Sequence, residues 1–161
     1  MATVTAISTK GGGGGKATLK YICREDKTES GKYITTLNCS LPTVYQEFKN
    51  TREMYGKTGG IKYYHFVQSH PSGYEIQPEL AHRIAVEFAE IAFKGHECVV
   101  ATHIDAEHIH SHIVFNSVNA DTGMKYHSNK FTLNDIRTLS DEICQKYGVQ
   151  TLEKPVVNQR T

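Results

Sequence analysis

The feature that most constrains this chain is an alternating strand pattern at residues 109–118, joined by a short connection to an apolar segment at 98–104. Side chains of a β-strand point alternately to opposite faces of the sheet. In the later segment Ile109, Ile113 and Phe115 therefore share one face, which we expect to be the core face. The short connection predicts that the two segments pair as an antiparallel hairpin.

Histidines gather on the other face of this hairpin. His110 and His112 are two residues apart, and antiparallel pairing brings His103 beside them. Imidazoles at this spacing have Cα atoms about 6.5–7 Å apart, and their ring nitrogens can converge on one metal ion. Three neutral imidazoles leave open coordination positions, which is typical of a catalytic site. The sequence predicts these three as ligands, with Asp105 accepting the second ring N–H of one of them; the role of His108 stays open.

The remaining pattern predicts an α+β fold. Apolar residues recur at three- and four-residue spacing after Pro78 and near the C-terminus, as in helices that bury one face. A capping box of Thr132 and Asp135 is expected to start the last helix. The further expected elements are strands at 3–8 and 61–69 and helices at 17–24 and 43–55. This order favours a central, mainly antiparallel sheet flanked by helices.

Length and composition narrow the class of protein. A chain of 161 residues, 39% apolar and 22% charged, fits one globular domain. It contains no stretch long enough to cross a membrane, and its N-terminus lacks the pattern of a signal peptide, so we expect a cytoplasmic protein without membrane insertion. The four cysteines form no CxxC pair, which argues against a cysteine-based zinc site.

The charge is distributed unevenly. Residues 1–65 carry ten basic and five acidic side chains, whereas residues 66–161 carry eight and twelve. A basic N-terminal part can contact phosphates, although chance clustering explains the same distribution. The pentaglycine segment 11–15, flanked by Lys10 and Lys16, lacks the GK[ST] of a P-loop, and we interpret it as a mobile surface loop in preference to a phosphate-contacting one.

The string HxD…HxHxxxN, which runs from His103 to Asn116, resembles the relaxase/mobilisation nuclease family of conjugative plasmids and integrative conjugative elements, part of the HUH endonuclease superfamily. The middle residue of the triplet His110–Ser111–His112 departs from the family's hydrophobe, and the overlapping triplet at 108–110 fits the pattern instead. Two further segments resemble the family's other motifs: Leu19–Ile22 around Tyr21, and His65–Ser69 followed by Gly73 and Glu75.

The resemblance implies an HUH relaxase-like fold, with residues 1–155 as the catalytic domain and 156–161 as a tail or the start of a truncated C-terminal region. It implies that Tyr21 is the nucleophile that forms a 5′-phosphotyrosyl bond, with Tyr33 as its nearest rival, and that Ser69 holds DNA near the nick. A free tyrosine has a pKa of about 10 and is a weak nucleophile at neutral pH, so a nearby cation supplies the missing stabilisation.

The implied activity is metal-dependent, site- and strand-specific nicking and strand transfer of single-stranded DNA at an origin of transfer. Mn²⁺ or Mg²⁺ is the favoured ion, with Zn²⁺, Ni²⁺ and Co²⁺ also compatible with three histidines. Expected partners are the single-stranded origin DNA, a relaxosome accessory protein and a coupling protein. Basic residues near Tyr21 are expected to neutralise phosphates: Lys10, Lys16, Lys20, Arg24 and Lys27.

Three alternatives stay open. A rolling-circle replication initiator shares the HUH site and would cut a replication origin. A metal-dependent nuclease that uses water would form no covalent adduct, and a Tyr21→Phe change would leave its cutting intact. In a non-enzymatic nucleic-acid-binding module the histidines would be structural, and a chelator would change nothing.

Overall fold

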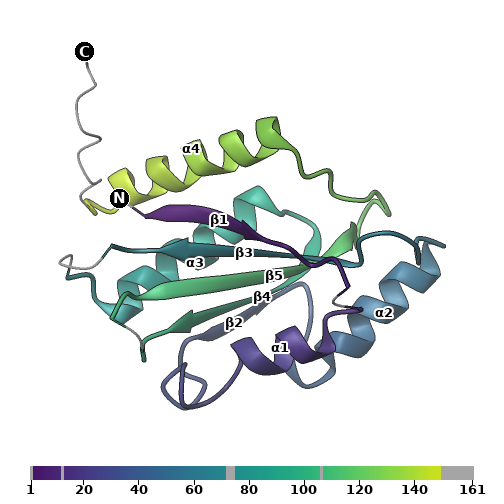
Figure 1. Cartoon of the computed structure of the whole chain (residues 1–161), viewed down its shortest axis with the longest axis horizontal. Coiled ribbons are helices and arrows are strands. Elements are labelled where there is room, and N and C mark those ends of the chain that lie inside the picture. The colour runs from purple at the N-terminus through teal and green to yellow at the C-terminus, as the bar shows by residue number, and fades with distance from the viewer. Residues whose placement is uncertain (1, 12, 72–74, 106, 150–161) are drawn as a thin grey trace.

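The structure, a computed structural model, describes residues 2–11, 13–71, 75–105 and 107–149. They form one antiparallel sheet with the strand order β1-β3-β5-β4-β2 (Figure 1). Its strands are β1 (Thr3–Ile7), β2 (Ile34–Leu37), β3 (Tyr63–Ser69), β4 (His96–His103) and β5 (His110–Asn119). The helices are α1 (Lys16–Ile22), α2 (Val44–Met54), α3 (Pro78–Ala92) and α4 (Lys130–Lys146), with a short 3₁₀ turn, η1 (Leu41–Thr43), before α2. The predicted α+β class is therefore confirmed.

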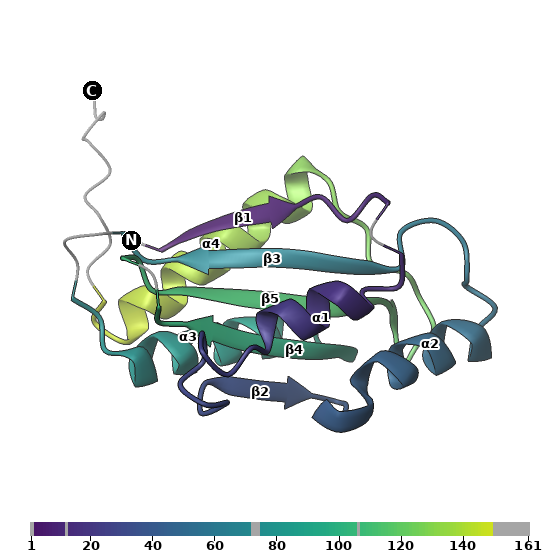
Figure 2. The same ribbon diagram turned by 60° about the horizontal axis from the view of Figure 1, so that its bottom comes forward.

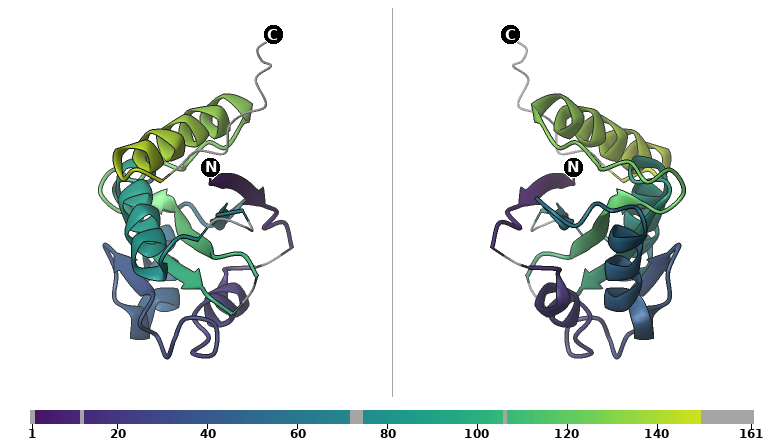
Figure 3. Two further views of the ribbon diagram at one scale, coloured as in Figure 1. Left: turned by 90° about the vertical axis from the view of Figure 1, so that its left-hand side faces the viewer. Right: turned by 90° about the vertical axis from the view of Figure 1, so that its right-hand side faces the viewer.

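The predicted hairpin is present as β4 and β5, and it occupies the centre of the sheet. The alternation on β5 did not, however, identify a single core face. The face with Ile113 and Phe115 packs against α3 and α4, whereas Val114 on the opposite face is equally buried, in a second cluster with Leu19 and Phe48 from α1 and α2. Figure 3 shows α3 and α4 on one side of the sheet and α1 on the other.

Two local predictions differ from the structure. The edge strand β2 was not predicted. The capping box of α4 is formed by Asn129 and Thr132, three residues earlier than expected: the Asn129 side chain accepts from the backbone N–H of Thr132, whose hydroxyl accepts from the N–H of Asn129. The predicted Gly73 of the second motif and the tail 156–161 lie outside the described residues. No helix among the described residues is long and apolar enough to cross a membrane.

Buried histidines other than His103, His110 and His112 make the stability of the fold depend on pH in the acidic range. His70 is 2% exposed, and burial lowers its pKa from 6.5 to about 4. Because its folded-state pKa is below its unfolded value, this stability is complete above about pH 6.5 and is lost as the pH falls towards 4. The loss is about 1.4 kcal/mol per pH unit for each histidine that must stay neutral.

We therefore expect the free energy of unfolding of metal-free protein, measured in urea, to fall between pH 6.5 and 5. A His70→Gln variant should lose about 2 kcal/mol less over that interval. The exposed His127 provides the control, because a His127→Gln variant should keep the wild-type pH dependence. Equal pH dependence in all three proteins would contradict the assignment to His70.

Candidate metal centre and the tyrosine beside it

The three predicted ligands meet at one end of the sheet. His103 ends β4 and pairs directly with His110, the first residue of β5, while His112 lies on the same face one pleat further. Their ring centroids are 5.1 Å apart for His103–His110, 4.3 Å for His103–His112 and 5.0 Å for His110–His112. One nitrogen from each ring lies within 4.8 Å of the others. The described residues thus bring together the three imidazoles that the sequence selected.

Backbone carbonyls fix the tautomers of two of these rings. Nε2 of His103 lies 2.9 Å from the carbonyl of Ile22, and Nδ1 of His110 lies 3.1 Å from that of His108. A carbonyl can only accept, so each of these nitrogens carries the proton and its partner nitrogen keeps a lone pair. His103 Nδ1 and His110 Nε2 are therefore the atoms available to a metal. His108 is exposed, and its contact with the cluster is the hydrogen bond from His110 to its backbone carbonyl, not one made by its imidazole.

The third ring is oriented by another histidine. Nδ1 of His112 lies 2.7 Å from Nε2 of His65 on β3, which leaves Nε2 for a ligand. This Nε2 and Nδ1 of His103 are both buried without a hydrogen-bond partner among the described residues. Such orphaned nitrogens are costly unless something occupies their lone pairs. The residues present therefore fit a divalent cation.

Burial favours the neutral form of two of these imidazoles, His103 and His112. It lowers the pKa of His112 from 6.5 to about 2, with the neighbouring histidines adding to the effect, and burial also lowers the pKa of His103. Metal ligands must be deprotonated. His103 and His112 therefore present their lone pairs without competition from protons at neutral pH.

Asp105 does not hold a histidine, which corrects the sequence-based expectation. Its carboxylate accepts from Nζ of Lys27 at 2.8 Å. That ion pair lowers the pKa of Asp105 and raises that of Lys27. The second nitrogens of the three candidate ligands are taken by Ile22, His65 and His108 instead.

Tyr21 lies beside the centre. The helix α1 begins after Gly15, whose backbone has φ +99° and whose absent Cβ would lie 3.1 Å from the Tyr63 ring, so glycine is required at this entry. Leu19 and Ile22 are buried against the sheet, and Tyr21 stays 45% exposed. Figure 2 shows α1 lying over the central strands.

The Tyr21 ring contacts two of the candidate ligands edge-on. Its centroid is 5.9 Å from that of His103 and 6.1 Å from that of His112. Nζ of Lys27 lies 5.5 Å from the same ring centroid. A phenol, a cation and the candidate metal-binding cluster thus lie side by side. The rival Tyr33 is 4% exposed and donates its hydroxyl proton to Glu79.

Ser69 borders the centre on the neighbouring strand β3. It ends β3, pairs with His110 in register and therefore points to the same face. It lines an open hollow of ≈ 380 Å³ together with Thr3, His70 and His108. His110 lines the same hollow, so the hollow adjoins the candidate metal centre.

Sequence reasoning missed His65. The available signal was its two-residue spacing from Val67 and Ser69, which places all three on the His112 face of the sheet. It also missed the Ile22 carbonyl, for which a sequence carries no signal.

The chain was compared with known proteins. The family described as MobA/VirD2-like relaxase, nuclease domain, matches residues 21–149. A Staphylococcus aureus protein named Protein rlx is 38% identical over 154 residues, 96% of this chain and 44% of the relative, and a second Protein rlx of that species is 34% identical over 160 residues, 99% and 48%. Group II intron-interrupted relaxase LtrB of Lactococcus lactis subsp. cremoris is 34% identical over 112 residues, 61% and 20%. The chain spans less than half the length of these relatives.

Proposed function

The chain belongs to the MobA/VirD2-like relaxase nuclease family, and from that premise we propose that it nicks single-stranded DNA at a transfer origin through a covalent bond to Tyr21. The observation that carries the proposal is the contact of the exposed Tyr21 ring with His103 and His112. Each of these two rings also has a buried nitrogen without a hydrogen-bond partner among the described residues. The nucleophile and the site for the phosphate are therefore adjacent.

In the proposed reaction the phenolic oxygen of Tyr21 attacks the scissile phosphorus. A bond forms between that oxygen and phosphorus, the bond from phosphorus to O3′ breaks, and the proton lost by the phenol is balanced by one gained at O3′. The products are a 5′-phosphotyrosyl enzyme and a free 3′-OH. Because the covalent bond keeps the phosphodiester energy, the reverse attack by a 3′-OH rejoins a strand without ATP.

A divalent ion bound by His103, His110 and His112 would supply positive charge to a phosphate oxygen. Mn²⁺ or Mg²⁺ is proposed, and Zn²⁺, Ni²⁺ or Co²⁺ suits the same three imidazoles. The histidines accept no proton in this scheme. Their role is to present fixed lone pairs, which the partners of their second nitrogens ensure.

Two further residues act around the nucleophile in this proposal. Lys27, held by Asp105, brings an ammonium group to the phosphate that Tyr21 attacks. Ser69 holds the strand on the far side of His110. The proposed substrate is single-stranded origin DNA, with a relaxosome accessory protein and a coupling protein as partners.

The test is incubation of the protein with a labelled single-stranded oligonucleotide from its own transfer origin, with Mn²⁺ or Mg²⁺, followed by a denaturing protein gel. A labelled band at the mass of protein plus DNA, absent when EDTA is added first, supports the proposal. Cleavage without such a band would favour a nuclease that uses water. A replication initiator would instead form its adduct on replication-origin DNA.

A separate prediction concerns His65. Removing the partner of a metal-bound histidine costs typically 10–100-fold in metal affinity. We expect His65→Ala to weaken Mn²⁺ binding by that factor in calorimetry, and His65→Gln, which keeps a hydrogen-bonding side chain, to recover part of it. The neighbouring Tyr64 faces the other core, so a Tyr64→Phe control should bind Mn²⁺ as the wild type does. Unchanged affinity in His65→Ala would show that His112 needs no such partner.

A further inference from the structure

A basic groove lies at the end of the sheet away from the histidines. Two adjoining hollows, of ≈ 360 and ≈ 140 Å³, are both lined by Lys62, which precedes β3. The larger is lined by Lys10, Gly11 and Gly13, and the smaller by Gly14, Tyr45, Lys49 and Arg52. We call this surface the Lys62 groove.

The lining of the groove has more basic than acidic side chains. Its lining includes four basic residues, Lys10, Lys49, Lys62 and Arg52. It includes one carboxylate, that of Glu53. None of the ion pairs formed within the described ranges includes any of the three lysines. By contrast, Arg24, one of the cations that the sequence analysis assigned to DNA near Tyr21, pairs with Asp26.

Glycines and an aromatic ring complete the surface. A Cβ on Gly14 would lie 3.0 Å from Tyr45 Cε1 and 3.1 Å from an Arg52 guanidinium nitrogen, so this glycine allows close approach of the backbone. Lys16 lies 5.8 Å from the centroid of the Tyr45 ring. A positive groove with glycine backbone and an aromatic side chain in its lining is similar to the surfaces that bind single strands without reading sequence.

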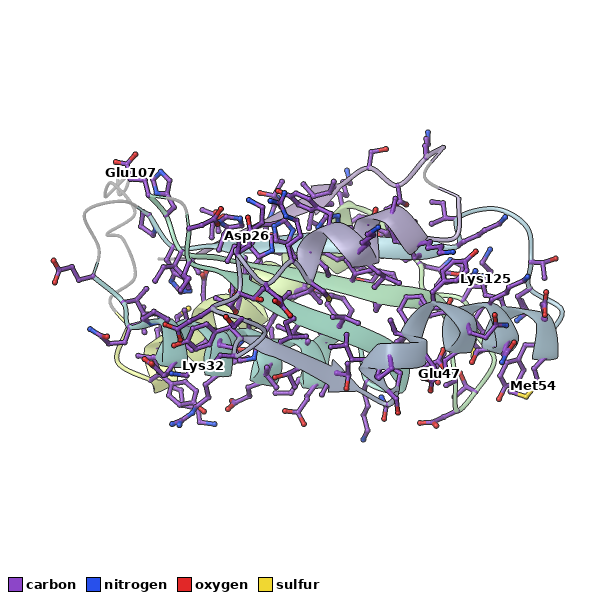
Figure 4. All side chains as sticks on the ribbon, turned by 90° about the horizontal axis from the view of Figure 1, so that it is seen from below. Asp26, Lys32, Glu47, Met54, Glu107 and Lys125 are labelled. Carbon is purple, nitrogen blue, oxygen red and sulfur yellow. The ribbon has the colours of Figure 1, made fainter. Side chains whose placement is uncertain are left out.

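The strand β3 and the helix α1 both run between the Lys62 groove and the histidine cluster. β3 begins one residue after Lys62 and ends at Ser69 beside His110, a run of seven residues or about 23 Å. The helix α1 lies along this path, from Lys16 near the groove to Tyr21 at the cluster, with Lys20 exposed between them. Figure 4 labels Lys125 and Glu107 near these two opposite ends of the sheet.

We propose that the Lys62 groove binds phosphates of the same DNA strand at a distance from the scissile phosphate, and that Gly11, Gly13 and Gly14 leave the backbone of the groove open to them. The inference rests on the proposed function, because it takes single-stranded DNA as the ligand. It gives the groove a positioning role: it holds a distant part of the strand in line with Tyr21 and reads no base edges.

The experiment is fluorescence anisotropy with labelled (dT)20 in EDTA, where no cleavage occurs, at several salt concentrations. Each phosphate contact on a single strand contributes about −0.7 to the slope of log K against log salt. We expect Lys62→Gln to reduce the slope by about 0.7 and the pair Lys10→Gln/Lys62→Gln to reduce it by about 1.4. These exposed or half-exposed side chains are outside the cores, so the variants should fold normally.

Lys94→Gln is the matched control, since this exposed lysine lies in a different hollow, beside α3. Its slope should equal that of the wild type. A double variant with the wild-type slope and affinity would overturn the proposal. The result is separable from the proposed nicking, because the binding measurement needs neither metal nor Tyr21, and a failure to form the covalent adduct would leave it interpretable.

Discussion

Replacement of Tyr21 by phenylalanine is expected to remove the covalent protein–DNA adduct, with a fall in cleavage of at least about 10³-fold, as for other covalent nucleophiles. The change deletes one oxygen atom, which is the atom that would bond to phosphorus. The ring contacts with His103 and His112 stay in place because they involve the aromatic edge. The defect should therefore appear in the denaturing gel and be absent from Mn²⁺ affinity and thermal stability.

Tyr33 supplies the matched control. It was the nearest rival as nucleophile, but its hydroxyl is hydrogen-bonded to Glu79 away from the histidines. Tyr33→Phe should keep the adduct and lose at most the roughly 1 kcal/mol of stability that one hydrogen bond contributes. An adduct that persists in Tyr21→Phe and disappears in Tyr33→Phe would reverse the assignment.

The second large effect is expected on thermal stability in the presence of metal. A ligand at 100 times its dissociation constant stabilises the folded state by about 2.7 kcal/mol. For a protein of this size that corresponds to a rise in Tm of roughly 5–10 °C. Mn²⁺ should raise the Tm of the wild type by this amount, and it should leave the Tm of His112→Ala unchanged, because that variant loses one of three ligands.

The measured quantity is the difference between the Tm with and without Mn²⁺ for the same variant. A lower Tm of metal-free His112→Ala therefore does not affect it. His108→Ala is the matched control from the same hairpin, since the exposed His108 ring is outside the cluster. It should keep the full Mn²⁺ response. If it loses the response and His112→Ala keeps it, the overlapping triplet at 108–110 holds the metal.

Periodicity predicted the parts of this molecule that depend on one strand and its neighbour. The hairpin, its register and the meeting of His103 with His110 and His112 all follow from side-chain alternation and a short connection. It could not predict what covers the histidine face. The uninterrupted apolar run from Cys98 to Ala101 was the available sign that β4 is buried on both sides.

The remaining errors involve partners that are distant in sequence or lack a pattern. Asp105 was assigned to one of the ligand histidines, but a cation 78 positions earlier, Lys27, pairs with it. The strand β2 has four residues of intermediate burial, too few to establish a period. The capping box of α4 was placed three residues late because Thr132 fits either end of that motif.

One hydrogen bond joins the two halves of the proposed chemistry. His103 donates to the carbonyl of Ile22, the residue that follows Tyr21 at the end of α1. A ring that is fixed by metal on one nitrogen and by this helix on the other links the occupancy of the centre to the docking of the helix. Such linkage is reciprocal. If a bound ion favours the packing of α1 on the sheet, the packed helix raises the affinity for the ion by the same factor. In the proposed mechanism, metal binding and the placement of Tyr21 are therefore cooperative.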